Sequence, residues 1–194
     1  MKKSLVLFFL VFAAAASAQT STATTANQAA YVRPDAERRF KHFVSDTVGP
    51  FAWVGIATGA GFSTAINNPK EWGKSANGFG KRFASNFGKN LIKNTAIYGL
   101  DEALKLDSHF YRSPKRDLGS RISNAFLSTV TARKPNGKRA IGIPRIVGSY
   151  TSDIIAKEVW YPARYGWKDG LKGGSITLGV NAFFNLFREF VLKK

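Results

Sequence analysis

The chain has 194 residues, with 29 Lys and Arg against 12 Asp and Glu, and it contains no cysteine. This length suits a single domain that can bury a core without a disulfide or a structural metal. The absence of cysteine excludes thiol chemistry and a disulfide framework. The net charge of +17 predicts attraction to anionic partners, although it does not select a fold.

The first 18 residues have the pattern of a secretory signal peptide. Two lysines precede an apolar run over residues 5–12, and Ala16-Ser17-Ala18 matches the A-x-A rule for cleavage. We therefore expect residues 1–18 to be removed on export. The expected location is the periplasm or the outer membrane of a Gram-negative cell, with the protein peripheral or partly embedded.

The next residues predict a flexible leader over 19–33, because Thr, Ala, Gln and Ser there offer little apolar surface to offset the entropy of ordering. Structure is expected from Pro34, where Asp35 and Glu37 place acids in the first turn of a helix. Residues 34–194 are then one helical domain.

The segment after Pro50 carries no charge and has small residues at Gly55, Gly59 and Ser63. This four-residue spacing is typical of helix faces that let another backbone approach closely. The apolar stretch over 51–66 is shorter than a full span of about 20 residues. It therefore fits a buried core helix or a segment that enters the membrane, and the sequence leaves both open.

A third helix is expected from Ser75 to about Leu106. Phe79, Phe83 and Phe87 recur every four residues along one side, and basic residues lie along another. Glycine disfavours the helix interior, so we expect close packing or a break near Gly88.

Three more helices are expected over 117–133, 144–160 and 168–194, with a turn at 134–138. The last repeats the small spacing at Gly170, Gly174 and Gly179, which predicts packing against the glycine face of 51–66. The fold class expected is all-α, a compact bundle of five or six glycine-rich helices. An alternation of apolar and polar residues over 176–182 keeps a small outer-membrane β-barrel as an alternative.

Catalytic signals are sparse. His42 and His109 are the only histidines, and no metal-ligand spacing surrounds them, so we expect no metal and no cofactor. Residues 107–112 do combine an acid, a hydroxyl, an imidazole and a guanidinium. A small hydrolase that uses this loop is therefore an alternative, although a non-enzymatic protein is favoured.

Basic residues concentrate between 112 and 145, where Asp117 is the one acid. They predict binding to anionic lipid or to an envelope polymer, with nucleic acid as the less favoured partner. With the basic side of the third helix, the predicted anionic-surface residues are Arg112, Lys115, Arg116, Arg121, Arg133, Lys134, Lys138, Arg139, Arg145, Arg82, Lys89 and Lys93. Four tryptophans are expected to act as interfacial anchors: Trp53, Trp72, Trp160 and Trp167.

Several short motifs resemble an uncharacterised family of exported bacterial glycine-rich helical proteins. The motifs are PKEWG at 69–73, GFGKRF at 78–83, IKNT at 92–95, FYRS at 110–113, WYP at 160–162 and NLFREF at 185–190. The resemblance covers about residues 45–190 and implies a glycine-rich helical domain behind a signal peptide. It implies no activity, cofactor or catalytic residue.

Overall fold

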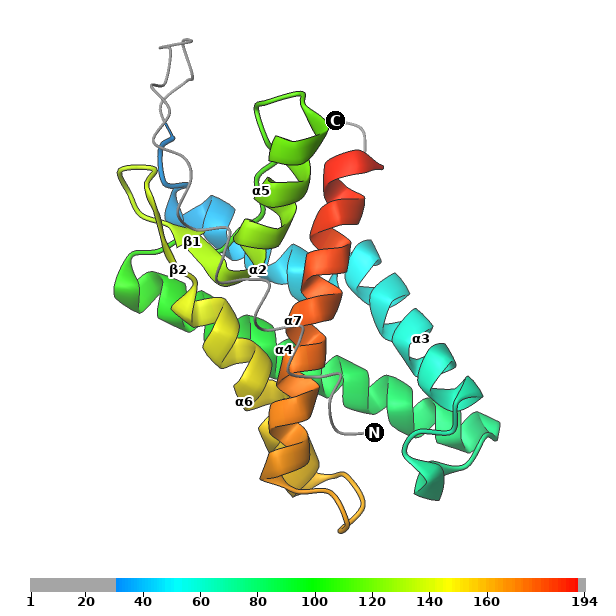
Figure 1. The fold of residues 1–194 in the computed structure, drawn as a ribbon. Helices are drawn as coiled ribbons and strands as arrows, with labels where there is room; N and C mark the ends of the chain where they lie inside the picture. Colours follow the sequence, from blue (N-terminus) through cyan, green and yellow to red (C-terminus); the bar gives the residue numbers. More distant parts are fainter. Residues whose placement is uncertain (1–30, 192–194) are drawn as a thin grey trace. The chain divides into compact units, whose positions relative to one another are not determined.

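The structure is a computed structural model, and it describes residues 31–191 (Figure 1). The predicted signal peptide and most of the predicted leader lie outside these residues. The last residues of the predicted flexible leader, 31–33, are instead held by hydrogen bonds. The hydroxyl of Tyr31 donates to Asp107 Oδ2 at 2.5 Å, and the Arg33 guanidinium donates to the carbonyls of Asp101 and Leu106. Phenol and guanidinium donors thus fix residues that we expected to be flexible.

Six α-helices and one small hairpin make up the described part of the chain. Their bounds are α2 Ala36–Val48, α3 Pro50–Ala65, the 3₁₀ turn η1 Lys70–Trp72, α4 Ala76–Leu104, α5 Leu118–Val130, β1 Thr131–Arg133, β2 Arg139–Ile141, α6 Ile143–Val159 and α7 Trp167–Phe190. The predicted all-α class, a compact bundle of helices, is confirmed.

Side-chain caps begin three of these helices where the sequence indicated. Asp35 caps α2 through Arg38 N, Ser75 caps α4, and Asp117 caps α5 through Ser120 N at 2.7 Å. Helix α4 then continues without the break expected near Gly88. A Cβ on that glycine would lie 3.5 Å from the Trp160 ring, at ordinary van der Waals distance, so the helix packs against this ring at Gly88 without a break.

The hairpin corrects the expected extent of the fourth helix, which ends at Val130 and not at Arg133. Residues Thr131–Arg133 pair antiparallel with Arg139–Ile141. The predicted turn at 134–138 connects them, with Gly137 at a φ of 77°. The backbone of residues 131–133 therefore forms hydrogen bonds with the second strand in place of the bonds of another helical turn.

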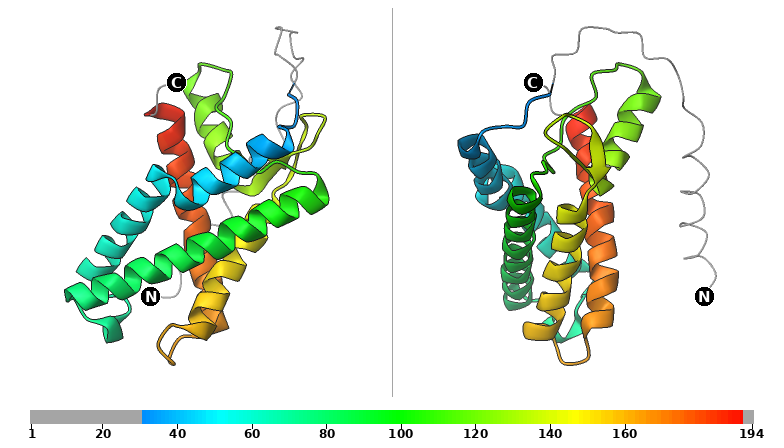
Figure 2. Two further views of the ribbon diagram at one scale, coloured as in Figure 1. Left: turned by 180° about the vertical axis from the view of Figure 1, so that it is seen from behind. Right: turned by 90° about the vertical axis from the view of Figure 1, so that its left-hand side faces the viewer.

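Helix α4 lies between the α2–α3 pair and α6, and α7 covers α6 on the side away from α4 (Figure 2). Helix α5 packs on the C-terminal half of α7, next to the hairpin. Residues 176–182, whose alternation also fitted a strand, are helical in α7.

Two glycines of α7 form its seam with α6. A Cβ at Gly170 would lie 2.5 Å from Ile154 Cα, and one at Gly174 would lie 2.9 Å from Tyr150 Cα. No side chain fits at these distances, so the close approach of the two backbones depends on glycine. Gly179 faces open space.

The expected packing between the two glycine faces is wrong. Gly55 of α3 faces the Phe184 ring, and Gly59 faces the Asn86 side chain of α4. The backbone carbonyl of Ser63 accepts a hydrogen bond from Asn68 N at 2.9 Å. Small residues therefore do line α3, but the side chains of Phe184 and Asn86 occupy the space beside them. The close backbone approach of α7 is to α6 and not to α3.

The interior is unusual in composition. The largest side chains that are almost fully buried include Arg82, Glu189 and Asn185. The buried hydrophobic residues are Ile56, Ala60, Leu106, Phe110, Ala125, Ala132, Ala156 and Ala182, most of them alanines. Many large apolar side chains are instead exposed, among them several of α3 and α7.

Candidate functional site

Helix α7 has its polarity reversed relative to a helix of a water-soluble bundle. Its inward face carries Gly170 and Gly174 and buries the amide of Asn185 and the carboxylate of Glu189. Its outward face is a stripe that we call the α7 apolar stripe: Ile176, Val180, Phe183 and Phe187, with exposed fractions of 67%, 47%, 65% and 39%. These positions share one side of an α-helix. Contiguous exposed apolar surface of this kind marks an interaction site.

A second apolar face lies on α3, where Phe51, Val54 and Phe62 are all more than 60% exposed. Gly55 of the same helix meets the Phe184 ring of α7, so the two helices approach each other at this point. Within residues 31–191, no helix combines the length and the hydropathy needed to cross a bilayer.

The N-terminal end of α7 is aromatic and basic. Trp167 begins the helix and is 54% exposed, and Lys168 and Lys172 are exposed within the next turns. Tryptophan and lysine beside an apolar helix face suit the boundary between lipid tails and headgroups. Of the predicted anchors, Trp167 is therefore the one with its ring most open to solvent.

The other three predicted anchors are used for packing. Trp53 stacks on Phe87 at 5.3 Å, although it stays 41% exposed. Trp160 donates from Nε1 to Ser85 Oγ at 2.9 Å, and Trp72 packs on the ring of Tyr161 at 4.8 Å. A hollow of about 570 Å³ lies between the two tryptophans, lined by Trp72, Lys81, Ala84, Ser85, Gly88 and Trp160.

The predicted basic residues divide into two groups. Four are exposed and have no hydrogen bond or ion pair from the side chain within the described residues: Lys115, Arg116, Lys134 and Lys138. All of the others except Lys93 have a side-chain hydrogen bond, an ion pair or a ring contact within the described residues. Arg112 donates to the carbonyl of Arg188, Arg133 lies over the Tyr31 and Tyr111 rings, Arg139 donates to Asn124, Ser128 and Thr131, and Lys89 pairs with Asp153.

Arg82 was predicted to bind an anionic surface, and this prediction is wrong. Its side chain is 2% exposed. The guanidinium donates to the carbonyls of Asn68 at 2.9 Å, Pro69 at 2.7 Å and Gly73 at 2.6 Å, and it lies against the Trp72 ring. The guanidinium therefore holds the loop between α3 and α4 and is not accessible to an anionic surface.

Arg121 also acts inside the bundle, with the buried carboxylate of α7. Glu189 is 1% exposed and accepts from Arg121 Nε at 3.2 Å, from Asn124 Nδ2 at 3.1 Å and from the backbone N–H of Ser113. The same guanidinium covers the Phe190 ring at 4.2 Å. Both carboxylate oxygens of Glu189 therefore accept hydrogen bonds, as a buried carboxylate requires.

The loop over 107–112 does not align a nucleophile with a base. Asp107 accepts from the hydroxyls of Tyr31 and Tyr111, and burial raises the pKa of Tyr111. Ser108 donates to Asp101 Oδ1 at 2.9 Å and not to His109. Burial also raises the pKa of Asp101, to about 6. Triad-type chemistry needs a hydroxyl against the imidazole, and this loop directs its hydroxyl elsewhere.

The sequence did not indicate a set of polar residues that share the electrostatic influence of Asp46, which we call the four-helix junction: His42 and Asp46 of α2, Lys93 of α4, His109 of the loop, Arg145 of α6 and Arg188 of α7. The imidazoles of His42 and His109 are stacked at 3.9 Å. Arg188 reaches Asp46 Oδ1 at 3.4 Å, and Arg145 donates to the carbonyl of Ser108. Elements distant in sequence supply these groups, so spacing could not reveal the cluster.

Electrostatics in the junction is strongly perturbed by burial. Burial lowers the pKa of Lys93 to about 8 and that of His109 to about 4. It also lowers the pKa of Arg145, against the opposing effect of Asp46 and Asp101. Perturbed values gathered in one place are a feature of functional sites, and also of structural ion-pair networks.

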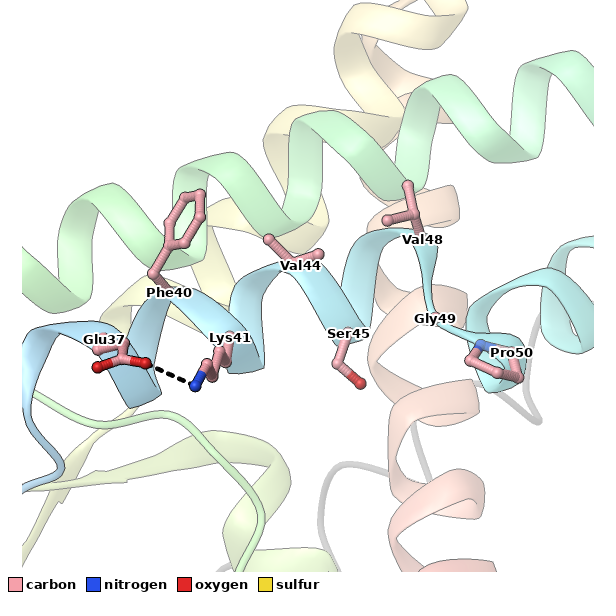
Figure 3. A pocket seen from close by; sticks show the side chains of 8 residues that line it. All are labelled: Glu37, Phe40, Lys41, Val44, Ser45, Val48, Gly49 and Pro50. Atoms are coloured by element: carbon pink, nitrogen blue, oxygen red, sulfur yellow. Dashed lines mark hydrogen bonds and ion pairs between the residues drawn. The ribbon is translucent and has the colours of Figure 1, made fainter.

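A further hollow of about 560 Å³ runs along α2 (Figure 3). Phe40, Val44 and Val48 form an apolar row on one side of the helix, and the Glu37–Lys41 pair lies on the other side. Its titratable groups are an exposed surface pair, so this hollow offers no acid–base chemistry. Across residues 31–191, no three His, Asp or Glu side chains gather in a way that could hold a metal ion.

Comparisons with protein-family models, with curated proteins and with solved structures found no match. The resemblance to an exported glycine-rich family therefore stays a prediction, and the function must be inferred from the geometry alone.

Proposed function

We propose that this protein is a non-enzymatic component of the cell envelope that attaches to an anionic membrane surface. One observation carries the proposal: α7 turns its large apolar side chains outward and its glycine, amide and carboxylate groups inward. Burying a large apolar side chain gains about 1.5–3 kcal/mol, so several such side chains on one stripe supply substantial affinity for lipid. The proposed depth is that of an interfacial helix, not that of a span.

Charge supports an anionic lipid over a neutral one. Lys172 and Lys168 lie about one and two turns before Ile176 on the same side of α7 as the stripe, and Trp167 is exposed at the start of the helix. Four further basic residues are exposed elsewhere on the bundle: Lys115, Arg116, Lys134 and Lys138. Each basic residue near a negatively charged leaflet adds about 1 kcal/mol at low salt. The predicted export would bring these residues to the membrane surfaces of the envelope.

The test is flotation of the purified protein with vesicles of phosphatidylcholine, alone or with phosphatidylglycerol, at low and high salt. The double variant Phe183→Ser/Phe187→Ser shortens the stripe. A matched control is Ile141→Ser/Val159→Ser, which alters two exposed apolar residues on β2 and α6. We expect the first variant to lose at least ten-fold in vesicle affinity and the control to lose less than two-fold.

The molar mass of each protein, from light scattering without vesicles, provides the decisive comparison. If the wild type is an oligomer that Phe183→Ser/Phe187→Ser converts to a monomer, while neither floats with vesicles, the stripe is a contact between copies and the proposal fails. Equal binding to neutral and anionic vesicles at low salt would contradict the preference for anionic lipid.

A further inference from the structure

Two of the short sequence motifs, PKEWG at 69–73 and WYP at 160–162, meet in the fold. The rings of Trp72 and Tyr161 pack at 4.8 Å, and Trp72 and Trp160 line the hollow of about 570 Å³. Helix α4 supplies its other lining residues: Lys81, Ala84, Ser85 and Gly88. We call this space the two-tryptophan hollow. It lies where the 3₁₀ turn η1, helix α4 and the end of α6 come together.

Both tryptophans are held by contacts within the protein. Trp160 Nε1 donates to Ser85 Oγ at 2.9 Å, and the Trp160 ring is at van der Waals distance from α4 at Gly88. The Arg82 guanidinium lies 5.9 Å from the centroid of the Trp72 ring. Arg82 is itself fixed by the carbonyls of the loop between α3 and α4. Side chains that are ordered before binding lose little entropy on binding, so the hollow is preorganised.

The charges at this site favour an anion over a cation. Aromatic rings often bind organic cations over their faces, but here the protein supplies the cations itself. Arg82 lies against Trp72, and Lys157 Nζ is 3.4 Å from the centroid of the Tyr161 ring. Lys81 adds an exposed ammonium to the hollow, and its side chain has no hydrogen bond or ion pair within residues 31–191. None of the six lining residues is acidic, so a ligand with negative charge is favoured.

We propose that the two-tryptophan hollow binds a short segment of an acidic glycan, in which a sugar carries a carboxylate. The C–H groups on the face of a sugar ring are attracted to the negative face of an indole ring. The two tryptophans supply this apolar surface, and Lys81 supplies an ammonium for the carboxylate. The volume of about 570 Å³ falls within the range of roughly 300–1,000 Å³ that is usual for sites of small ligands.

A single-stranded nucleic acid also combines flat rings with negative charge, but the hollow suits it less well. Binding of single strands without sequence preference uses a track of basic side chains along the phosphates, and Lys81 is the one cation that lines this hollow. Recognition of a base uses hydrogen bonds to its edge. The one other polar side chain of the lining is Ser85, which already accepts from Trp160. The predicted export also brings the hollow to the glycans of the envelope.

The two-tryptophan hollow shares no residue with the α7 apolar stripe. The inference therefore goes beyond membrane attachment and does not depend on it. Soluble ligands test it without any vesicle, so a failure of one proposal leaves the other standing.

The experiment titrates the ¹⁵N-labelled full chain with tetragalacturonic acid, with the neutral maltotetraose and with a short oligothymidylate. Titration calorimetry gives the affinity for each probe. The indole N–H signals in NMR spectra report where the probe binds, since the chain has four tryptophans and single Trp→Phe variants assign their signals.

Two pairs of variants test the lining. Ala84→Leu fills the hollow from an exposed position of α4, and Ala103→Leu is the matched control on the same helix, outside the hollow. Lys81→Gln removes the ammonium, and Lys105→Gln is the control at the exposed C-terminal end of α4. The spectrum of each variant without ligand shows whether the fold is retained.

We expect tetragalacturonic acid to bind about ten-fold more tightly than maltotetraose at low salt, because the lysine charge adds to the stacking. It should shift the Trp72 and Trp160 signals more than the other two. Ala84→Leu should weaken binding about ten-fold by occupying the space, and Lys81→Gln about five-fold by removing the charge. Both controls should stay within about two-fold of the wild type.

Several outcomes would overturn the proposal. If neither sugar binds, if binding leaves the Trp72 and Trp160 signals unchanged, or if Ala84→Leu and Ala103→Leu bind equally well, the hollow is not a glycan site. Equal affinity for the two sugars would refute the preference for an acidic glycan. Tighter binding of oligothymidylate at the same indoles would assign the hollow to nucleic acid instead.

Discussion

Two buried guanidinium groups in this bundle have opposite surroundings. Arg82 fills the loop between α3 and α4. Its guanidinium donates hydrogen bonds to three backbone carbonyls and to the side chain of Asn67. Arg145 has one backbone carbonyl, from Ser108, and its Nε is left without an acceptor in the described part of the chain. The cost of burial is offset within the loop at Arg82 and remains at Arg145. The difference separates a guanidinium that holds a loop in place from one whose burial is only partly compensated by hydrogen bonds.

The largest effect is expected at the satisfied guanidinium. Arg82→Met leaves the carbonyls of Asn68, Pro69 and Gly73 without their donor, at about 1–3 kcal/mol for each that stays buried. Urea denaturation followed by circular dichroism should show a loss of about 3–5 kcal/mol in the free energy of unfolding. Arg116→Met, an exposed control, should change it by less than about 0.5 kcal/mol. A loss at position 82 no larger than the control would remove the contrast with Arg145.

A smaller loss is expected at the satisfied carboxylate of α7. Both oxygens of Glu189 accept hydrogen bonds, so the amide nitrogen of Glu189→Gln would face a donor from Asn124, Ser113 or Arg121. We expect a loss of about 2–3 kcal/mol in the free energy of unfolding from this near-isosteric change. Glu158→Gln, on the exposed side of α6, serves as the control and should be neutral. Stability equal to the wild type would show that water already compensates the charge.

The third expected effect is a pH dependence of stability that belongs to Lys93. Burial disfavours the charged form of Lys93 and lowers its pKa from the ordinary 10.5 of lysine to about 8 in the folded chain. Between pH 8 and 10.5 the unfolded state binds more protons at this residue, so stability rises with pH across that window.

Lys157 has a folded pKa near 8 for the same reason and contributes to the same rise, so the wild-type curve alone does not isolate Lys93. The difference between wild type and Lys93→Met does isolate it. We expect Lys93→Met to be more stable than the wild type at pH 8, because it removes the cost of burying the charge, and we expect this advantage to shrink toward pH 10.5, measured by urea denaturation at each pH. Parallel curves would mean that Lys93 is solvated in the native state.

The helices themselves were predictable from local chemistry. Asp35, Ser75 and Asp117 are good N-caps, and each begins a helix in the structure. The end of α5 was missed because Thr131–Arg133 extends a helical pattern that the pairing with Arg139–Ile141 overrides. Local propensity is a weak prior where a ladder partner lies a few residues further along the chain.

The placement of charges was not predictable. Arg82 and Lys93 both fall on the basic side of α4 when only its sequence is considered, yet one is enclosed by the loop before the helix and the other faces α2 and α6. Tertiary contacts decide between these outcomes. The tyrosine and arginine at the end of the expected leader were likewise assigned by composition, which says nothing about a single phenol that meets a buried carboxylate.

The alanine-rich interior has a thermodynamic consequence. The heat capacity of unfolding grows with the apolar area that becomes hydrated, at about 12–15 cal/mol/K per residue for ordinary domains. A fold that leaves many phenylalanine and valine side chains partly exposed and encloses arginine and glutamate hydrates less new apolar area on unfolding than a fold that buries those apolar side chains fully. Its stability should therefore vary gently with temperature, with a broad maximum and weak cold destabilisation.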